Sequence, residues 1–266
     1  MARSPQVKNP SAASRAKEAP KPPPLPDPRQ AEGPRRPFAD PGWDEAWWWL
    51  GIPVAVAAFA LISYQISPDW NWRWVSSEGL GFLEIAQFGV MVIGLVIAVQ
   101  LLFDPFVRRR PLVFAVTALA ALSCFYIAGE EVSWGQHIVY FDPTGLLPED
   151  NHSGEFSIHN VHDIFERAPR TVLEIGVFLG GIVVPLWCAV APKWRASRLA
   201  LFLPAAALVP AAIGALLFKA IDVSSAGLVS RPSESIEFYL YFFILAYLIV
   251  FERRITALET AARGKR

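Results

Sequence analysis

The sequence predicts an all-α membrane protein, a polytopic bundle of about six transmembrane helices with both chain ends on the cytoplasmic side. Three observations support this prediction. Apolar residues make up 53% of the 266 positions, long apolar runs recur six times, and Lys and Arg gather next to alternate connections between those runs. So high an apolar content exceeds what a water-facing surface accommodates, and the excess side chains must face lipid or each other.

Residues 1–41 form a segment of different composition. They hold eleven of the 23 prolines, with scattered Lys, Arg, Ala and Ser and almost no apolar side chains. Such a segment cannot bury enough apolar surface to fold, and we expect a disordered Pro-rich cytoplasmic tail. Residues 42–255 then form the six-helix transmembrane domain, and residues 256–266 a short basic cytoplasmic tail.

The apolar runs have the length that a membrane crossing requires. A helix needs about 20 residues to cross ~30 Å of hydrocarbon, and in lipid only a helix satisfies its own backbone hydrogen bonds. The fifth run contains Pro204, Pro210 and many alanines, so we expect a broken or tightly packed helix there, with Gly214 permitting close approach. The predicted spans are 46–66, 80–103, 111–129, 172–191, 198–218 and 235–251.

The orientation follows from the distribution of basic residues. Nineteen of the 24 Lys and Arg fall in the N-terminal tail, in the connections after the second and fourth spans, or after the sixth span. Basic residues beside a span are retained in the cytoplasm, which makes these connections cytoplasmic. No basic face of the kind that binds nucleic acid is present. We expect a multi-pass protein whose partner is membrane lipid, and the family resemblance described below implies the inner membrane of a bacterium.

Carboxylates recur at the outer ends of four spans, about one helical turn inside. A carboxylate at this depth costs several kcal/mol unless it is paired, neutralised or hydrated. One explanation is that these acids face the interior of the bundle, and the other is that they reach the lipid headgroups. They are Glu84, followed one turn later by Gln87, then Glu130 and Glu131, Glu174, and the pair Glu234 and Glu237.

The longest connection, residues 130–171, lies on the same outer side and holds every histidine of the chain, His137, His152, His159 and His162. If span three continues as a helix beyond the membrane, Glu130, Ser133 and His137 share one face. Residues 157–167 have the pattern of a short amphipathic helix with His159, His162, Asp163 and Glu166 on its polar side. That face could also be merely solvated.

Imidazole beside carboxylate is the usual ligand set for zinc and related divalent ions. We therefore assign His137, His159 and His162 as candidate ligands of a divalent metal such as zinc. The candidate catalytic acids and bases are Glu130, Glu131 and Glu237, one of which could take a proton from a bound water. The other polar residues assigned to this site are Glu84, Ser133, Gln136, Asn160, Asp163 and Glu234.

The run Glu130-Glu131-Val132-Ser133-Trp134-Gly135-Gln136 at the end of span three resembles a Glu-Glu-x-Ser-Trp-Gly-Gln signature of an uncharacterised family of bacterial polytopic membrane proteins. Ile158-His159-Asn160 and the pair Glu234 and Glu237 are similar to the same pattern. The resemblance covers spans three to six and implies no established activity. It supports the choice of residues without supplying their roles.

Three functions fit these features. The first is a metal-dependent hydrolase or transferase, whose site opens at the outer, periplasmic face and acts on a lipid or lipid-linked substrate. The second is a structural or accessory subunit of a membrane complex, in which the polar residues tie the loop to the bundle. The third is an ion- or proton-coupled transporter, although the cytoplasmic halves of the spans offer no matching ionisable residues.

Overall fold

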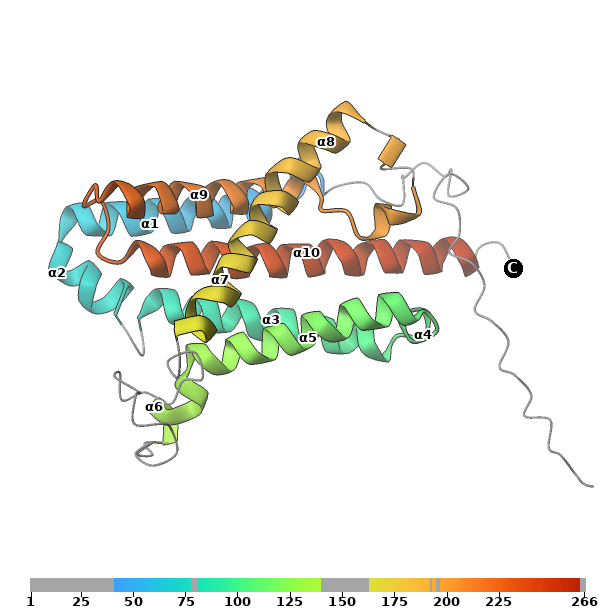
Figure 1. Cartoon of the computed structure of the whole chain (residues 1–266), viewed down its shortest axis with the longest axis horizontal. Coiled ribbons are helices and arrows are strands. Elements are labelled where there is room, and N and C mark those ends of the chain that lie inside the picture. The colour runs from blue at the N-terminus through green and yellow to red at the C-terminus, as the bar shows by residue number, and fades with distance from the viewer. Residues whose placement is uncertain (1–40, 78–80, 140–162, 192, 195–196, 264–266) are drawn as a thin grey trace, which may run out of the picture.

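The computed structural model describes residues 41–77, 81–139, 163–191, 193–194 and 197–263, and in these ranges all regular structure is helical (Figure 1). Six helical stretches are long and apolar enough to cross a membrane, which confirms the all-α six-span prediction and makes the chain a multi-pass membrane protein. The spans are η3–α1 (Trp47–Gly51, Ile52–Ile66), α3 (Phe82–Phe103), α5 (Pro111–Glu131), α7–η7–α8 (Asp163–Phe178, Leu179–Val183, Val184–Val190), η9–η10–α9 (Arg198–Leu201, Ala206–Leu208, Val209–Ser224) and α10 (Pro232–Arg263).

The last span lies at the centre of the bundle. In its most apolar 18-residue window 72% of the residues are buried, against 17–28% in the first four spans. Figure 1 shows α10 between a layer of α1 and α9 and a layer of α3 and α5, with α7 crossing the bundle obliquely. The neighbouring helices therefore cover most of α10, whereas the first four spans leave most of their apolar side chains exposed to the surrounding lipid. The helix also runs on to Arg263, so residues 256–263, assigned from the sequence to a tail, are helical.

Small residues let the neighbouring helices approach α10 closely. A Cβ atom added to Gly214 of α9 would lie 2.2 Å from a ring carbon of Tyr239, a distance that packed atoms do not reach. Tyr239 is fully buried, and its hydroxyl donates a 2.6 Å hydrogen bond to the carbonyl of Pro53 in α1. One aromatic side chain of α10 thereby fixes both α9 and α1, and the expected role of Gly214 is confirmed.

The fifth span is broken, as its prolines predict. Its chain leaves the 3₁₀ turn η9 and passes Pro204 before η10 and α9 begin, which exposes backbone carbonyls inside the protein. The buried guanidinium of Arg254 donates hydrogen bonds to the carbonyls of Ala200 (3.0 Å), Leu201 (3.4 Å) and Leu203. Arg254, one of the basic residues that indicate the cytoplasmic side, thus also satisfies the acceptors that this break creates.

The chain's described beginning and end lie at the same end of the bundle. Arg253 of α10 forms an ion pair with Glu45, in the 3₁₀ turn η2 (Trp43–Glu45), and its guanidinium lies 5.7 Å from the ring centre of Trp48. Hydrogen bonds from Arg253 and Trp48 hold the pKa of Glu45 below its usual value. We call this end the basic end, after Arg108–Arg110, Arg253 and Arg254. The opposite end, with Glu84, Glu131, Glu174, Glu234 and Glu237, is the carboxylate end.

Replacing Gly214 by Ala tests the central packing. The added methyl group must displace the ring of Tyr239, and we expect a loss of about 1–3 kcal/mol in the free energy of unfolding, which is the usual cost of overpacking. Thermal unfolding of the detergent-purified protein, followed by tryptophan fluorescence, measures this loss. Gly176→Ala on α7 is the matched control, because no atom lies within 4 Å of its added Cβ. An equal loss of unfolding free energy in the two variants would contradict the close packing of Gly214 against Tyr239.

Candidate functional site

Span three ends abruptly at Glu131. The next residues form a left-handed turn, with φ of +44° at Ser133, +51° at Trp134 and +88° at Gly135. The prediction that span three continues as a helix, with Glu130, Ser133 and His137 on one face, is therefore wrong. Three successive residues of positive φ end the helical hydrogen-bond pattern, and only Gly135 adopts such a φ without steric cost.

Trp134 explains why the chain turns here. Its ring folds back onto Gly129, where an added Cβ would lie 2.8 Å from a ring carbon. Its indole N–H donates a 2.7 Å hydrogen bond to Oε1 of Glu130, and Phe125 and Tyr126 contact the same ring edge-on. The interactions of one tryptophan with its own helix therefore offset the backbone strain at Ser133 and Trp134. Glu130, only 9% exposed, belongs to this turn.

Glu131 lies in a cluster of acids. Its carboxyl group is hydrogen bonded to the hydroxyl of Tyr241 in α10, and it interacts electrostatically with Glu237, Glu234 and Glu84. These four acids come from α3, α5 and α10, so the carboxylates predicted to face the bundle interior do approach one another. Among the described residues, no Lys or Arg lies within salt-bridge distance of Glu131. A carboxyl group in this position is stable with a bound proton or a nearby cation.

Basic side chains flank the cluster on the side of α7 and α9. Arg170 of α7 contacts Oε1 of Glu237 at 2.9 Å and Oε1 of Glu174 at 3.4 Å, and Nζ of Lys219 in α9 lies 3.1 Å from the same oxygen of Glu174. Neither cation was predicted from the sequence to contact these acids; both belong to the five Lys and Arg outside the cytoplasmic group. Lys and Arg are scarce on the outer side, whereas acids gather there. This imbalance was the sequence signal that the few outer cations pair with those acids.

The first turn of α10 is held by two other contacts. Arg231 contacts Oε1 of Glu234 at 3.2 Å and donates a hydrogen bond to the carbonyl of Ser76, at the end of the π-helical turn η4 (Asn71–Val75). Gln87 of α3 is fully buried, and its Nε2 donates a 2.7 Å hydrogen bond to the carbonyl of Glu234. Because a carbonyl only accepts, this contact fixes which way the amide of Gln87 points.

Gln87 also leaves one polar atom to be satisfied. Its Oε1 is buried without a hydrogen-bond partner in the described part of the chain. Glu84 lies one turn earlier on the same face of α3, and one of its carboxylate oxygens is buried as well. A buried acceptor beside acids calls for a donor such as water, a protonated carboxyl group or a cation.

Toward the basic end, the space between α3, α5 and α10 is apolar. Met91, Ala98, Cys124 and Leu248 pack together there and are almost fully buried. A Cβ atom on Gly94 would lie 3.1 Å from Sγ of Cys124, which shows how closely α3 and α5 approach. The polar cluster therefore belongs to one end of the bundle and does not continue through it along these helices.

The structure brings together some of the predicted site residues and leaves others apart. Glu84, Glu131, Glu234 and Glu237 converge, whereas Glu130 and Ser133 belong to the turn. Gln136 opens the short helix α6 (Gln136–Val139), which contains the backbone of His137. Outside the described residues lie His159, Asn160, His162 and the side chains of His137 and Asp163, together with the tail 1–40.

The predicted amphipathic helix 157–167 is described only from Asp163 onward, where α7 begins and continues into span four. Within the described ranges, no three His, Cys, Asp or Glu side chains are arranged to hold a metal ion. A metal site at this end therefore requires at least one ligand from His137 or from residues 140–168, whose side chains lie outside the described part of the chain.

Comparisons of the whole sequence and fold with known proteins provide no relative from which a function could be transferred, since no family model, curated protein or solved structure matches the chain.

Two substitutions test the turn after span three. Trp134→Phe keeps an aromatic ring but removes the hydrogen bond to Glu130, and we expect it to cost about 1–2 kcal/mol of unfolding free energy. Gly129→Ala forces the ring away and should cost at least as much. Thermal unfolding in detergent measures both, with Gly89→Ala as control, since its added Cβ has no atom within 4 Å. Unchanged unfolding free energy in both test variants would contradict the stabilising contacts of Trp134 with Gly129 and Glu130.

The charge balance of the cluster predicts opposite effects for two acids. Glu131→Gln replaces a carboxyl group that lies among acids and has no basic partner in the described part of the chain, so the free energy of unfolding at neutral pH should stay the same or rise. Glu174→Gln weakens contacts with Arg170 and Lys219 and should lower it by about 0.5–1 kcal/mol, because these groups are partly exposed. Chemical unfolding in mixed micelles measures both changes. Greater destabilisation by Glu131→Gln than by Glu174→Gln would contradict this charge balance.

Proposed function

We propose that the carboxylate end is the active site of a metal-dependent hydrolase or transferase that acts on a lipid or lipid-linked substrate. The observation that carries this proposal is the approach of Glu84 and Glu237 to Glu131, from three different helices, with the hydroxyl of Tyr241 beside Glu131 and Glu237. Acids at membrane depth are costly, and their concentration at one end of the bundle is typical of a functional site.

The described side chains suit acid–base chemistry on an anionic substrate. Glu131 has no basic partner among them, so its carboxyl group is suited to hold a proton and to donate it to a leaving group, and the hydroxyl of Tyr241 lies beside it. Arg170 and Lys219 lie beside the cluster, where their charges favour a phosphate or carboxylate group of the substrate. In this proposal Glu237 positions Arg170.

The histidines are the proposed metal ligands. The loop that holds them leaves the bundle directly after the Glu131 turn, through α6, and returns through α7, whose Arg170 contacts Glu237. Both described ends of the loop thus lie at the carboxylate end, and in this proposal the loop's His137, His159 and His162 hold the ion. A divalent ion such as zinc, once bound, lowers the pKa of its water ligand and polarises the bond to be cleaved.

We place the site on the periplasmic side of a bacterial inner membrane. The basic residues gathered at the opposite end support this orientation, since such residues are retained in the cytoplasm. The signature Glu130–Gln136 supports a bacterial origin by its resemblance to the bacterial family. A substrate reached from this side is amphiphilic, because the acids lie at the ends of membrane-spanning helices.

A structural role in a membrane complex is the second candidate. The chain of contacts from Lys219 through Glu174 and Arg170 to Glu237 favours it, because these contacts tie α7 and α9 to α10 without any ligand. In that case, substitutions in the cluster would lower the folded yield or the recovery of a partner. Transport has less support, because the apolar packing around Met91 and Cys124 closes the path toward the basic end.

Metal analysis of the full chain, purified in mild detergent, tests the proposal. Elemental mass spectrometry should find about one divalent ion per chain, and the double variant His159→Ala/His162→Ala should lose it, because two imidazole ligands are removed. His152→Ala is the matched control, since this histidine belongs to the same loop but not to the proposed ligand set, and it should keep the ion. Wild-type protein without a stoichiometric ion would contradict the metal site.

A further inference from the structure

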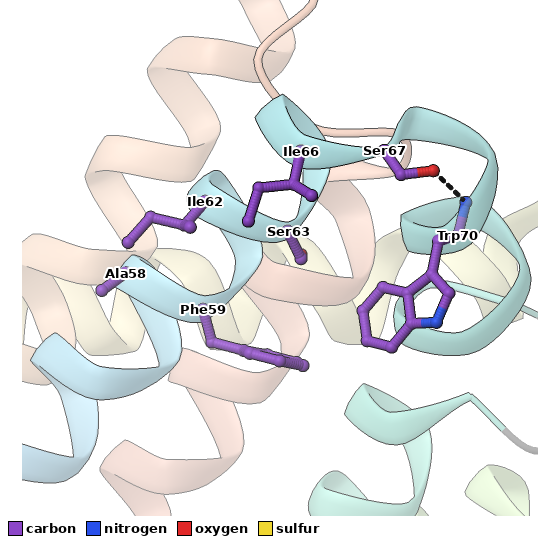
Figure 2. Close-up of a pocket in the computed structure, with 7 residues that line it drawn as sticks. All are labelled: Ala58, Phe59, Ile62, Ser63, Ile66, Ser67 and Trp70. Carbon is purple, nitrogen blue, oxygen red and sulfur yellow. Dashed lines mark hydrogen bonds between the residues drawn. The ribbon is translucent and has the colours of Figure 1, made fainter.

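An apolar groove lies at the carboxylate end of span one, where the short helix α2 (Pro68–Trp70) turns away from α1. Its volume is about 590 Å³, which lies in the range of small-molecule sites. Figure 2 shows the side chains that surround it, all from α1 and the following turn: Ala58, Phe59, Ile62, Ser63, Ile66, Ser67 and Trp70.

Buried hydrogen bonds brace this corner. The Oγ of Ser67 accepts a hydrogen bond from the backbone N–H of Trp70, drawn as a dashed line in Figure 2. Asn71 is fully buried, and its Nδ2 donates to Oγ of Ser63 at 2.7 Å and to the carbonyl of Ala60 at 3.3 Å. The angle between α1 and the turn is therefore fixed, and the groove is preformed, which lowers the entropic cost of filling it.

The groove faces the surrounding lipid. Its rim residues Ile62 and Ile66, in a membrane-spanning helix, are 57% and 79% exposed, and Trp70 is 46% exposed. From Ala58 to Ile66 the helix rises about 12 Å, close to the ~15 Å depth of one hydrocarbon leaflet. The length and lining therefore suit one acyl chain that runs from the headgroup level toward the middle of the bilayer.

The outer end of the groove offers groups for a lipid headgroup. Trp72 and Trp74 are exposed just beyond it, as indole rings are at the membrane–water interface. The guanidinium of Arg231 lies 6.0 Å from the ring centre of Trp72, and this cation can attract a lipid phosphate.

The groove is also next to the acid cluster. The ring of Phe59 in its lining packs 5.0 Å from the ring of Phe82, the first residue of α3, and Glu84 follows two residues later. Arg231, at the outer end, contacts Glu234 of the cluster. A lipid with its chain in this groove would place its headgroup beside the carboxylates.

We infer that the groove binds an acyl chain of a glycerophospholipid whose phosphate lies near Arg231. That this lipid is the substrate, or resembles its apolar part, rests on the proposed function; the binding itself does not.

Photolabelling tests the inference without an activity assay. The full chain is reconstituted into phosphatidylethanolamine and phosphatidylglycerol vesicles that contain phosphatidylethanolamine with a diazirine in one acyl chain. After illumination, mass spectrometry should find at least about threefold more lipid adducts on residues 58–70 than on the lipid-exposed face of α5 around Leu119 and Leu122, and the labelling of 58–70 should saturate with probe.

Ala58→Phe fills the groove and should reduce its labelling at least about threefold, whereas Ala115→Phe, the same change at an exposed position of α5, should leave it unchanged. Glu131→Gln should keep the labelling, which separates a failure of the groove from a failure of the proposed chemistry. Labelling of 58–70 no stronger than that of α5, equal labelling in the two Phe variants, or cross-links to a second copy of the chain in place of lipid adducts would overturn the inference.

Discussion

The burial of α10 among the other spans is the constraint from which the rest of the structure follows. Its apolar surface is covered on all sides, and close contacts such as Gly214 with Tyr239 leave little freedom in how α9 and α1 approach it. Since helices of similar length surround it, the outer ends of α3, α5, α7 and α9 meet near its first turns. Those turns carry Glu234, Glu237 and Tyr241, so central packing and the polar cluster are two results of one arrangement.

The acids that meet at the carboxylate end need basic or hydrogen-bonding partners. Arg170, Lys219 and Arg231 compensate Glu237, Glu174 and Glu234, while Glu131 meets a hydroxyl group and other acids. This uneven compensation is what distinguishes the site from a set of structural ion pairs, because a fully paired network would have no reason to keep an additional acid in its middle. A proton, a metal ion or a cationic part of a ligand would complete the charge balance, and each is consistent with a site that opens toward the lipid headgroups.

Much of this could be predicted from the sequence, because the relevant signals are long or chemically costly. A run of about twenty apolar residues predicts a membrane-spanning helix. Acids that recur at the same depth in several spans predict that these spans face a shared bundle interior. Two prolines among alanines predicted the break in the fifth span. The turn at Ser133–Gly135 could not be predicted, since it depends on the fold-back of Trp134 onto Gly129 and not on periodicity. Nor could the partners of the acids be assigned, because Arg170 and Glu237 are 67 positions apart and meet only through the packing of α7 on α10.

A double-mutant cycle between Arg170 and Glu237, measured as unfolding free energy in mixed micelles, tests most directly whether the outer helix ends converge on α10. Arg170→Met and Glu237→Gln remove the two charges with little change in size. We expect a favourable coupling of at least about 0.5 kcal/mol between them, and additive effects for the control pair Arg170 and Glu45, which lie at opposite ends of the bundle. Additivity within about 0.3 kcal/mol for Arg170 and Glu237 would contradict the convergence of the outer helix ends on α10.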